Sequence, residues 1–290
     1  MDEIDILQIG DLVHHKEEIS FYANTIPNHL LINHSRIEKP HKHNFYTSMI
    51  FTAGSGTHEI DFNRYIVKPG TVFTLAPGQT HSWELSDDIN GYIFFHNQEF
   101  FDLFFVRETL REYPVFRSIF FPNGICLSDE HQHHITNYFK RMLEEVKRDY
   151  WRKDMMLVNL TVQFYIEINR ILLSGERFQK TNSPYNLHFQ RFEDLLEQHF
   201  IQEKSALFYA EKLNLSPKHL NRICKATVNQ TTTEVIWNRV LLETKRMLIY
   251  SRKNFAEIAS VLGCDDYSYF SKVFKRKTGA TPKDFLKHYE

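Results

Sequence analysis

The sequence is poor in cysteine and contains no long apolar run. Its three cysteines, Cys126, Cys224 and Cys264, lie far apart among 290 residues and form no Cys-x-x-Cys pair. We therefore expect neither a disulfide framework nor a cysteine zinc site, and a reducing compartment is favoured. No run of about 18 apolar residues occurs and the first residues are acidic, so no membrane span or signal peptide is expected. These absences favour a cytoplasmic location.

The chain also lacks a substantial net charge, since its formal charge is −1. This average hides an asymmetry. Between Leu187 and Glu290 there are 17 Lys and Arg against 12 Asp and Glu, whereas residues 1–186 contain 18 against 24. The C-terminal part is thus the basic part, as neutralisation of a nucleic-acid backbone requires. The length and the 42% hydrophobic content predict two domains.

Residues 254–279 have the pattern of a helix-turn-helix. Asn254 and Glu257 have the spacing of an N-cap and its capping-box partner, and apolar residues follow at helical intervals. Gly263 is expected to end the first helix, and Asp266 lies in the turn that supplies the next N-cap. The outward side of the second helix is polar and basic, as a helix laid in a major groove would be.

An earlier segment repeats this pattern. Ala210 and Ala259 are 49 residues apart and occupy equivalent places, and residues 218–227 correspond to the second helix of the later copy. Ser216 is the N-cap expected before that helix. A long helix over residues 233–250 is predicted between the two copies. The chain therefore contains an internal repeat of a helix-turn-helix.

The first half of the chain has the pattern of short β-strands. From residue 36 to about residue 97, apolar segments alternate with Gly and Pro turns, which indicates an antiparallel barrel or sandwich. The expected strands are 46–52, 57–62, 65–68, 71–75, 81–85 and 91–96. Residues 1–35 have no clear period and are expected to form an N-terminal arm.

Histidines and glycines mark the predicted barrel. His41-x-His43, Gly54, Gly70 and the segment Pro77–His81 resemble the two motifs of the cupin superfamily. That resemblance implies a small jelly-roll barrel whose mouth holds a ligand or a metal.

The histidines leave two interpretations open, a metal site or a polar interior. His41, His43 and His81 could supply three imidazoles to Zn or Fe. Metal-binding cupins usually carry a Glu four residues after the second His, and Thr47 stands at that position. We therefore expect no bound metal and no cofactor. Because alternation along a strand sends about half of the aromatic side chains inward, an aromatic-lined ligand site is expected instead. Its candidate lining residues are His43, Tyr46, His81 and Trp83.

The segment that follows the barrel turns from aromatic to helical. Residues 98–127 are rich in Phe and are expected to pack under the barrel. Residues 129–174 have the periodicity of two helices, of which the second is apolar almost all round. This indicates either burial between its partner helix and the barrel or a homodimer interface. Residues 175–186 are polar, contain Gly and Pro, and are predicted to form a linker.

The C-terminal motifs resemble the AraC/XylS transcription regulators. The resemblance is carried by Ala210, Leu213, Leu215-Ser216-Pro217, His219-Leu220, Arg222, Ile258-Ala259, Gly263, Asp266, Ser268-Tyr269-Phe270, Phe274-Lys275, Gly279 and Thr281-Pro282. It covers residues 187–290, and many members of that family carry a cupin-like effector domain in front. The resemblance implies two recognition helices in successive major-groove segments, a dimeric front half, and activation through RNA polymerase.

The same resemblance indicates the DNA contacts. The candidates are Lys218, His219, Asn221, Arg222, Lys225, Tyr267, Ser268, Ser271, Lys272 and Lys275. Lys225 and Lys275 are expected to contact phosphate, or no part of the DNA, rather than bases. Cys224 and Cys264 replace a common Phe and Asn229 replaces a usual Gly, but each substitute is compatible with the fold. Lys272 replaces a frequent Arg and loses the bidentate recognition of guanine.

The sequence predicts an α+β multidomain protein. A cupin-like β-barrel (jelly roll) is expected to form the effector domain over residues 1–128, and a helical pair that is a possible dimerisation element over 129–174. The linker over 175–186 leads to an all-α double helix-turn-helix over 187–290.

We expect a sequence-specific, DNA-binding transcriptional regulator of AraC/XylS type, an activator controlled by a small-molecule effector in the barrel. The expected partners are double-stranded DNA, the effector, RNA polymerase and a second copy of the chain, without a membrane. No catalytic residue is expected, so the protein is not predicted to be an enzyme. Two alternatives stay open: a metal-dependent cupin enzyme fused to a DNA-binding domain, and a ligand-independent regulator whose barrel serves dimerisation.

Overall fold

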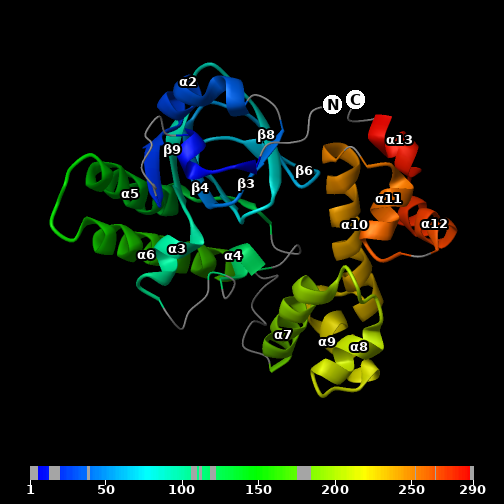
Figure 1. Ribbon diagram of the computed structural model, residues 1–290. Coiled ribbons are helices and arrows are strands. Elements are labelled where there is room, and N and C mark those ends of the chain that lie inside the picture. Colours follow the sequence, from blue (N-terminus) through cyan, green and yellow to red (C-terminus); the bar gives the residue numbers. More distant parts are fainter. Residues whose placement is uncertain are drawn as a thin grey trace. The chain divides into compact units, whose positions relative to one another are not determined.

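The computed structural model describes residues 6–12, 20–37, 40–105, 110, 113–117, 122–174, 184–251, 253–264 and 266–287. They form two compact units, one ending at Ser174 and the other beginning at Pro184 (Figure 1). The first unit contains all the described strands and the second contains only helices. This confirms the predicted fold class. None of the described helices has the length and apolar character needed to cross a bilayer.

The described residues of the N-terminal unit form two sheets and six helices. Its strands are β1 (Ile6–Leu7), β2 (Phe21–Thr25), β3 (His41–His43), β4 (Tyr46–Ala53), β5 (Gly56–Ile60), β6 (Asn63–Val67), β7 (Thr71–Leu75), β8 (Thr80–Leu85), β9 (Asn90–His96) and β10 (Gly124–Cys126). Its described helices are α1 (Ile9–Leu12), α2 (Ile26–Ile37), α3 (Gln98–Asp102), α4 (Pro114–Arg117), α5 (Asp129–Val146) and α6 (Lys153–Ser174). Strands β4 to β9 lie where the sequence predicts strands.

The two sheets face each other across a barrel interior. One sheet has the order β1-β3-β8-β5-β6 and the other the order β10-β7-β4-β9-β2. A two-residue turn with left-handed backbone at Asp61 and Phe62 joins β5 to β6, as hairpin twist favours. Alternation along β4 sends Met49 to the interior and Ile50 to the opposite face.

The N-terminal segment is part of the fold, which differs from the expected arm. Strand β2 pairs antiparallel with β9 along its whole length, from Phe21 opposite His96 to Thr25 opposite Tyr92. Helix α2 follows at once and buries His29 (Figure 1). A strand of five residues has too few positions to show a period, and its pairing with β9 supplies the stability that its own sequence does not reveal.

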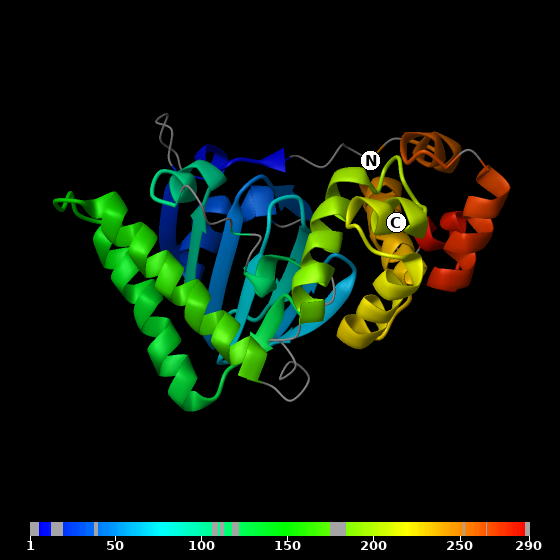
Figure 2. The ribbon, with the colours of Figure 1, turned by 90° about the horizontal axis from the view of Figure 1, so that it is seen from below.

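The helical pair covers the second sheet on the face away from the barrel interior. Helices α5 and α6 lie side by side along that face (Figures 1 and 2). Phe139 of α5 and Phe164 of α6 both contact Phe94 of β9. A buried hydrogen bond of 2.7 Å joins the Tyr165 hydroxyl to His96 Nε2, so α6 is fixed to β9 by polar as well as apolar contact.

The C-terminal unit is a row of helices arranged around one long helix. They are α7 (Pro184–His199), α8 (Ala206–Lys212), α9 (Pro217–Val228), α10 (Thr232–Tyr250), α11 (Phe255–Val261), α12 (Tyr267–Thr278) and α13 (Pro282–Lys287). Helix α10 connects the α7–α9 group to the α11–α13 group (Figure 1). Helix α7 begins at Pro184, within the segment expected as a linker, and residues 175–183 lie outside the described residues.

Local signals set the helix ends as expected. Ser216 caps α9, and Asn254 with Glu257 forms a complete capping box on α11. Asp266 accepts a hydrogen bond of 2.8 Å from the backbone N–H of Tyr269 and so begins α12. The reason is the same at each start, because the first N–H groups of a helix have no partner within it.

The internal repeat is visible in the backbone. Asn214 and Gly263, at equivalent places after α8 and α11, have φ of 55° and 61°. Asn229 and Gly279 end α9 and α12 with φ of 56° and 80°. Asn tolerates this left-handed conformation better than most residues, which confirms that Asn229 can replace the usual Gly.

Candidate functional site

Helices α9 and α12 are amphipathic and expose equivalent faces. Leu220, Ile223 and Cys224 are buried under α9, and Phe270, Val273 and Phe274 are buried under α12. The remaining side of each helix carries the cationic and hydrogen-bonding residues. Each helix has 12 residues, about 18 Å at 1.5 Å per residue, which suits one crossing of a major groove.

Most of the expected DNA contacts lie on these exposed faces. The exposed candidates are Lys218, Arg222, Lys225, Tyr267, Ser268, Lys272 and Lys275. The half-buried candidates are His219, Asn221 and Ser271. Exposure makes the first group available to a nucleic acid, whereas the second group also takes part in contacts within the unit.

Asn221 has a structural partner in this unit. Its Oδ1 accepts a hydrogen bond of 3.1 Å from the backbone N–H of Thr232, at the start of α10. Bidentate recognition of adenine needs the amide oxygen and the amide nitrogen together. In this arrangement Asn221 links α9 to α10, and its oxygen keeps one lone pair beside the two donors of its nitrogen.

Two cationic candidates on α9 differ in their surroundings. The Arg222 guanidinium lies 5.9 Å from the centre of the Tyr185 ring, which comes from α7. Lys225 lies 3.9 Å from the carboxylate of Glu234, so its charge is partly neutralised within the unit. Both interactions are at the surface, and neither would prevent contact with DNA.

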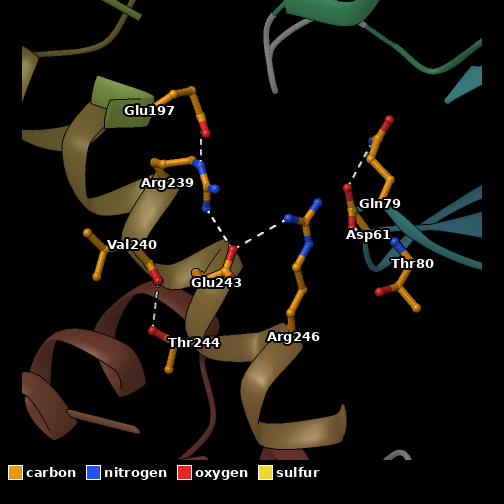
Figure 3. Close-up of polar contacts among 9 residues, drawn as sticks. All are labelled: Asp61, Gln79, Thr80, Glu197, Arg239, Val240, Glu243, Thr244 and Arg246. Carbon is orange, nitrogen blue, oxygen red and sulfur yellow. Dashed lines mark hydrogen bonds and ion pairs between the residues drawn. The ribbon is translucent and has the colours of Figure 1, made fainter. Parts of the chain in front are cut away.

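The turn before β8 sets the position of His81. Asp61 accepts a hydrogen bond of 2.9 Å from the Gln79 side chain and one of 3.2 Å from the backbone N–H of Thr80 (Figure 3). Gly78 has φ of 81°, and its N–H donates to the carbonyl of His43 at 2.9 Å. The Pro77–His81 motif is therefore a rigid turn that brings β8 into register beside β3.

A cluster of imidazole rings fills this part of the barrel interior. His41 lies opposite His81 in the paired strands, with ring centres 4.3 Å apart. His43 and His58 each lie 5.2 Å from the His81 ring, and His58 Nε2 is 2.9 Å from His81 Nδ1. The Trp83 ring stands 5.4 Å from that of His81. The structure thus brings together three of the four expected ligand contacts.

Tyr46 lies on the other face of the sheet from these histidines. Its ring stacks on His96 at 5.3 Å and meets Phe116 edge-on, in the core under the helical pair. Its hydroxyl donates to Gln98 Oε1 at 3.0 Å. Since neighbouring strand residues point to opposite faces, Phe45 faces the barrel interior and Tyr46 does not.

The histidines are not arranged as a metal site. His43 Nδ1 donates to the Phe45 carbonyl at 2.8 Å, and its Nε2 accepts from the Thr47 hydroxyl at 3.1 Å. Both ring nitrogens are therefore engaged, and Thr47 binds His43 at the position where a Glu would bind a metal. Among the described residues, no group of three or more His, Cys, Asp or Glu side chains has a geometry suited to a metal ion.

Burial keeps four of these imidazoles neutral. Burial first, and the charge of nearby His41 second, lower the pKa of His43 and of His58 to about 3. The same two causes lower the pKa of His29 to about 3 and hold that of His81 well below its ordinary value. No Lys or Arg is buried among the described residues of this unit. His29, His43, His58 and His81 therefore make this part of the interior polar without adding a positive charge.

The two units match two halves of one known architecture. Residues 31–155 match the model of an AraC-like ligand binding domain, and residues 209–288 match that of a helix-turn-helix domain. The chain belongs to the AraC family of transcriptional regulators. Its N-terminal barrel is the ligand-binding domain, and its C-terminal helices are the DNA-binding domain of an AraC-family protein.

The similarity to known proteins extends over most of the chain. The arabinose operon regulatory protein of Salmonella typhimurium is 22% identical, over 86% of this chain and 86% of its own length. The transcriptional activator RhaR of Mannheimia succiniciproducens is 21% identical, over 86% of this chain and 87% of its own. The structure of ToxT from Vibrio cholerae is 14% identical, covers 92% of this chain and 98% of its own, and gives a TM-score of 0.46.

Sequence reasoning missed two buried histidines of this AraC-family barrel, His58 and His29. His58 lies on β5 two residues before Ile60, so both side chains point into the barrel, and His29 lies on α2. Side chains alternate between the two faces along β5 as they do along β8, so pairing the two strands in the sequence would have placed His58 on the same face as His81. His29 carries no comparable signal, because its helix was not expected.

The N-terminal unit should lose stability in acid. His43 and His58 have a pKa of about 3 when folded, against about 6.5 in an unfolded chain, so the unfolded chain binds more protons between these values. The contribution of these two histidines to the free energy of unfolding is complete above about pH 6.5 and is lost as the pH falls toward 3. Each histidine lowers the free energy of unfolding by about 1.4 kcal/mol for each pH unit in this range. Urea titrations between pH 7 and pH 5 measure this slope.

Substitution of a buried histidine tests whether the histidine cluster causes this pH dependence of the free energy of unfolding. His58→Gln should reduce the number of protons taken up on unfolding at pH 5.5 by about one. Asn137→Gln on α5 is the control, because Asn137 is exposed in the folded unit and has no titratable group, so the uptake should stay unchanged. Equal uptake by the wild type and His58→Gln would contradict the assignment.

Proposed function

We propose that this AraC-family regulator binds DNA through α9 and α12 together, one helix in each of two successive major-groove segments, and activates transcription. The observation that carries the proposal is the pair of equally long, similarly capped helices within one compact unit, each exposing polar and basic side chains. The proposed base contacts are Lys218, Arg222, Tyr267, Ser268, Ser271 and Lys272, with His219 and Asn221 at the edge of the surface. Lys225 and Lys275 are proposed to contact phosphates.

Arg222 and Lys225 give the sharpest test of the division between base contacts and phosphate contacts. A guanidinium can form two parallel hydrogen bonds with guanine, whereas an ammonium acts as a point charge toward phosphate. The two residues lie on the same exposed side of α9, within about one turn of each other. Removing either one deletes a single positive charge from the same helix.

Arg222→Ala should weaken binding to the preferred site by about 10-fold to 100-fold, because a base contact supplies about 1–3 kcal/mol. It should change binding to unrelated DNA much less. The preferred site is first selected from randomised duplexes with the wild-type protein, and affinities are then measured on the selected and on a scrambled duplex.

Lys225→Ala is the matched control. It should weaken binding to both duplexes by the same factor and reduce the slope of log affinity against log salt by about one. Equal losses on the two duplexes for Arg222→Ala would show that Arg222 contacts phosphate rather than a base.

We also propose that the barrel binds a small, neutral molecule that carries hydroxyl groups. His58 Nδ1 and His81 Nε2 are buried and have no hydrogen-bond partner among the described residues. Because the two rings share one hydrogen bond, either tautomer leaves one N–H donor and one lone pair. A hydroxyl group can serve as acceptor for the first and donor to the second.

The charge of the interior supports a neutral ligand over an acid. A carboxylate that reached the His58–His81 pair would lose its hydration and would meet two neutral imidazoles there. Binding of an acid would therefore require proton uptake by a histidine. A neutral polyol meets no such requirement.

Matched pairs of compounds test the ligand class. Neutral pentoses, hexoses and hexitols, each paired with its aldonic acid, should raise the melting temperature at pH 7.5 only in the neutral form, by a few degrees near saturation. His81→Phe should remove the shift. Stabilisation by an aldonate without its neutral parent would contradict the proposed class.

Effector control follows if the ligand prefers one arrangement of the protein over another. Its differential affinity would then change how the two recognition helices are presented to DNA. Activation is supported by the similarity of the chain to the transcriptional activator RhaR, and we propose that it acts through RNA polymerase. Run-off transcription from the selected site should rise on addition of the protein.

We further propose that the helical pair forms a homodimer. Met155, Met156 and Ile166 on α6 are large apolar residues with exposed fractions of 47%, 43% and 37%. Met155 and Ile166 are 11 residues apart, about three turns, and so lie on the same side of α6, which also packs against α5. A second copy would remove this apolar surface from water.

Ile166→Glu should shift the chain from dimer to monomer in sedimentation velocity, since a charge would be buried in the contact. Leu31→Glu is the control, because Leu31 is 80% exposed on α2, outside the proposed contact. A dimer that survives Ile166→Glu, or that is lost with Leu31→Glu, would place the interface elsewhere.

A further inference from the structure

One lysine joins the segment before the first helix-turn-helix copy to the turn of the second copy. Lys204 lies between α7 and α8, before the first copy, and is half-buried. Its ammonium group donates to the carbonyl of Ile201 at 2.5 Å and to that of Gly263 at 3.1 Å, and also to the carbonyl of Leu262. Leu262 and Gly263 belong to the turn between α11 and α12, inside the second copy.

The electrostatics of this contact favour a cation. Ile201 follows the C-terminal end of α7, and Leu262 is the C-cap of α11. The last carbonyl groups of a helix have no partner within it and carry its negative partial charge. The three N–H groups of one ammonium match three such carbonyls, so Lys204 satisfies the ends of two helices at once.

Gly263 shows how closely the two copies approach. A Cβ atom at this position would lie 2.6 Å from the Ile201 carbonyl oxygen and 3.0 Å from Lys204 Nζ. Its φ of 61° also requires the left-handed region. The turn of the second copy therefore lies directly against the segment that begins the first copy, with Lys204 between them.

The other link between the copies is α10, and it is fixed firmly at the first copy. Arg239 donates to Glu197 of α7 at 2.6 Å and to Glu243 at 3.0 Å (Figure 3). Its guanidinium lies 3.9 Å from the centre of the Phe200 ring. Arg239 is buried, so this network fixes α7 to α10. At the second copy α10 ends at Tyr250, and a short segment precedes α11.

The second copy also packs against α10, since the Trp237 ring lies 6.0 Å from that of Tyr269 and 6.2 Å from that of Phe270 on α12. Lys204 adds a polar contact at a separate place, the turn that precedes α12. Packing on α10 and this contact together define the orientation of α12. The relative position of α9 and α12 thus depends on Lys204 as well as on α10.

We propose that Lys204 is a positioning residue that sets the spacing between the two DNA segments read by α9 and α12. This inference rests on the proposed function, in which both helices enter the same DNA. Lys204 need not contact DNA for this role. Its loss should relax the spacing that the protein accepts while the base preferences of each helix are retained.

Selection from randomised duplexes measures this spacing. The full chain and its Lys204→Met variant are each used to select 40-base-pair duplexes, and the distance between the two recovered sequence elements is compared. The wild type should recover two elements at one spacing of about one helical turn, 10–10.5 base pairs. Lys204→Met should recover the same elements over a spread of at least one extra base pair on either side.

Matched variants separate positioning from charge and from folding. Lys204→Arg retains a cation with several donors and should keep a narrower spacing than Lys204→Met. Lys212→Met removes a charge from the exposed end of α8, where its Nζ lies over Phe208, and should keep the wild-type spacing. Circular dichroism and melting temperature monitor the fold of each variant.

A second variant disturbs the same contact but keeps Lys204. Gly263→Asn should keep the left-handed turn, as Asn214 does at the equivalent place in the first copy, but its Cβ would push the turn away from Ile201. It should broaden or shift the spacing as well. This variant tests the proposal even if Lys204→Met fails to fold.

The outcomes distinguish this inference from the proposed function. Recovery of only one sequence element, or of none, by the wild type would contradict bipartite reading and the inference with it. Recovery of two elements by the wild type, with the same single spacing for folded Lys204→Met and Gly263→Asn, would overturn the positioning role alone. A broader spacing in these variants, with an unchanged spacing in Lys212→Met, would support it.

Discussion

The N-terminal unit depends on one constraint, the alternation of side chains along a sheet that is buried on both faces. The sheet of β10, β7, β4, β9 and β2 faces the barrel interior on one side and the helical pair on the other. Phe45 and Phe95 therefore belong to the interior, while Tyr46 and Phe94 belong to the core under α5 and α6. A shift of one residue would exchange the two sets, so this register decides which side chains can meet a ligand.

The interior derives its chemistry from polar groups that carry no charge. Burial makes a protonated imidazole expensive, and the histidines respond by staying neutral rather than by pairing with acids. His43 is satisfied by Thr47 and a backbone carbonyl, whereas the His58–His81 pair retains an unused donor and acceptor. One part of the cluster thus serves the fold, and the other part is available for recognition.

The C-terminal unit solves a different problem, which is to hold two reading helices in a fixed relation. Each copy is built from local signals, with side-chain caps at helix starts and left-handed residues at the turns. Local signals cannot orient one copy relative to the other. That orientation comes from α10, which Arg239 fixes to α7 and on which α12 packs through Trp237, and from Lys204, whose ammonium joins the Ile201 carbonyl before the first copy to carbonyls in the turn of the second. Polar contacts at helix ends therefore shape the surface offered to DNA.

The sequence by itself determined the features that local chemistry controls. The strands β4 to β9, the caps of α9, α11 and α12, and the 49-residue repeat follow from alternation, capping and helical spacing, and they sufficed to indicate the family. Only the tertiary structure decided that β2 and α2 complete the barrel, that His58 joins His81 while Tyr46 is turned away, and that Lys204 reaches Gly263. These features depend on contacts between residues far apart in the chain. A period or a cap records the partners of a residue within a few positions, and it carries no information about a partner 59 residues away.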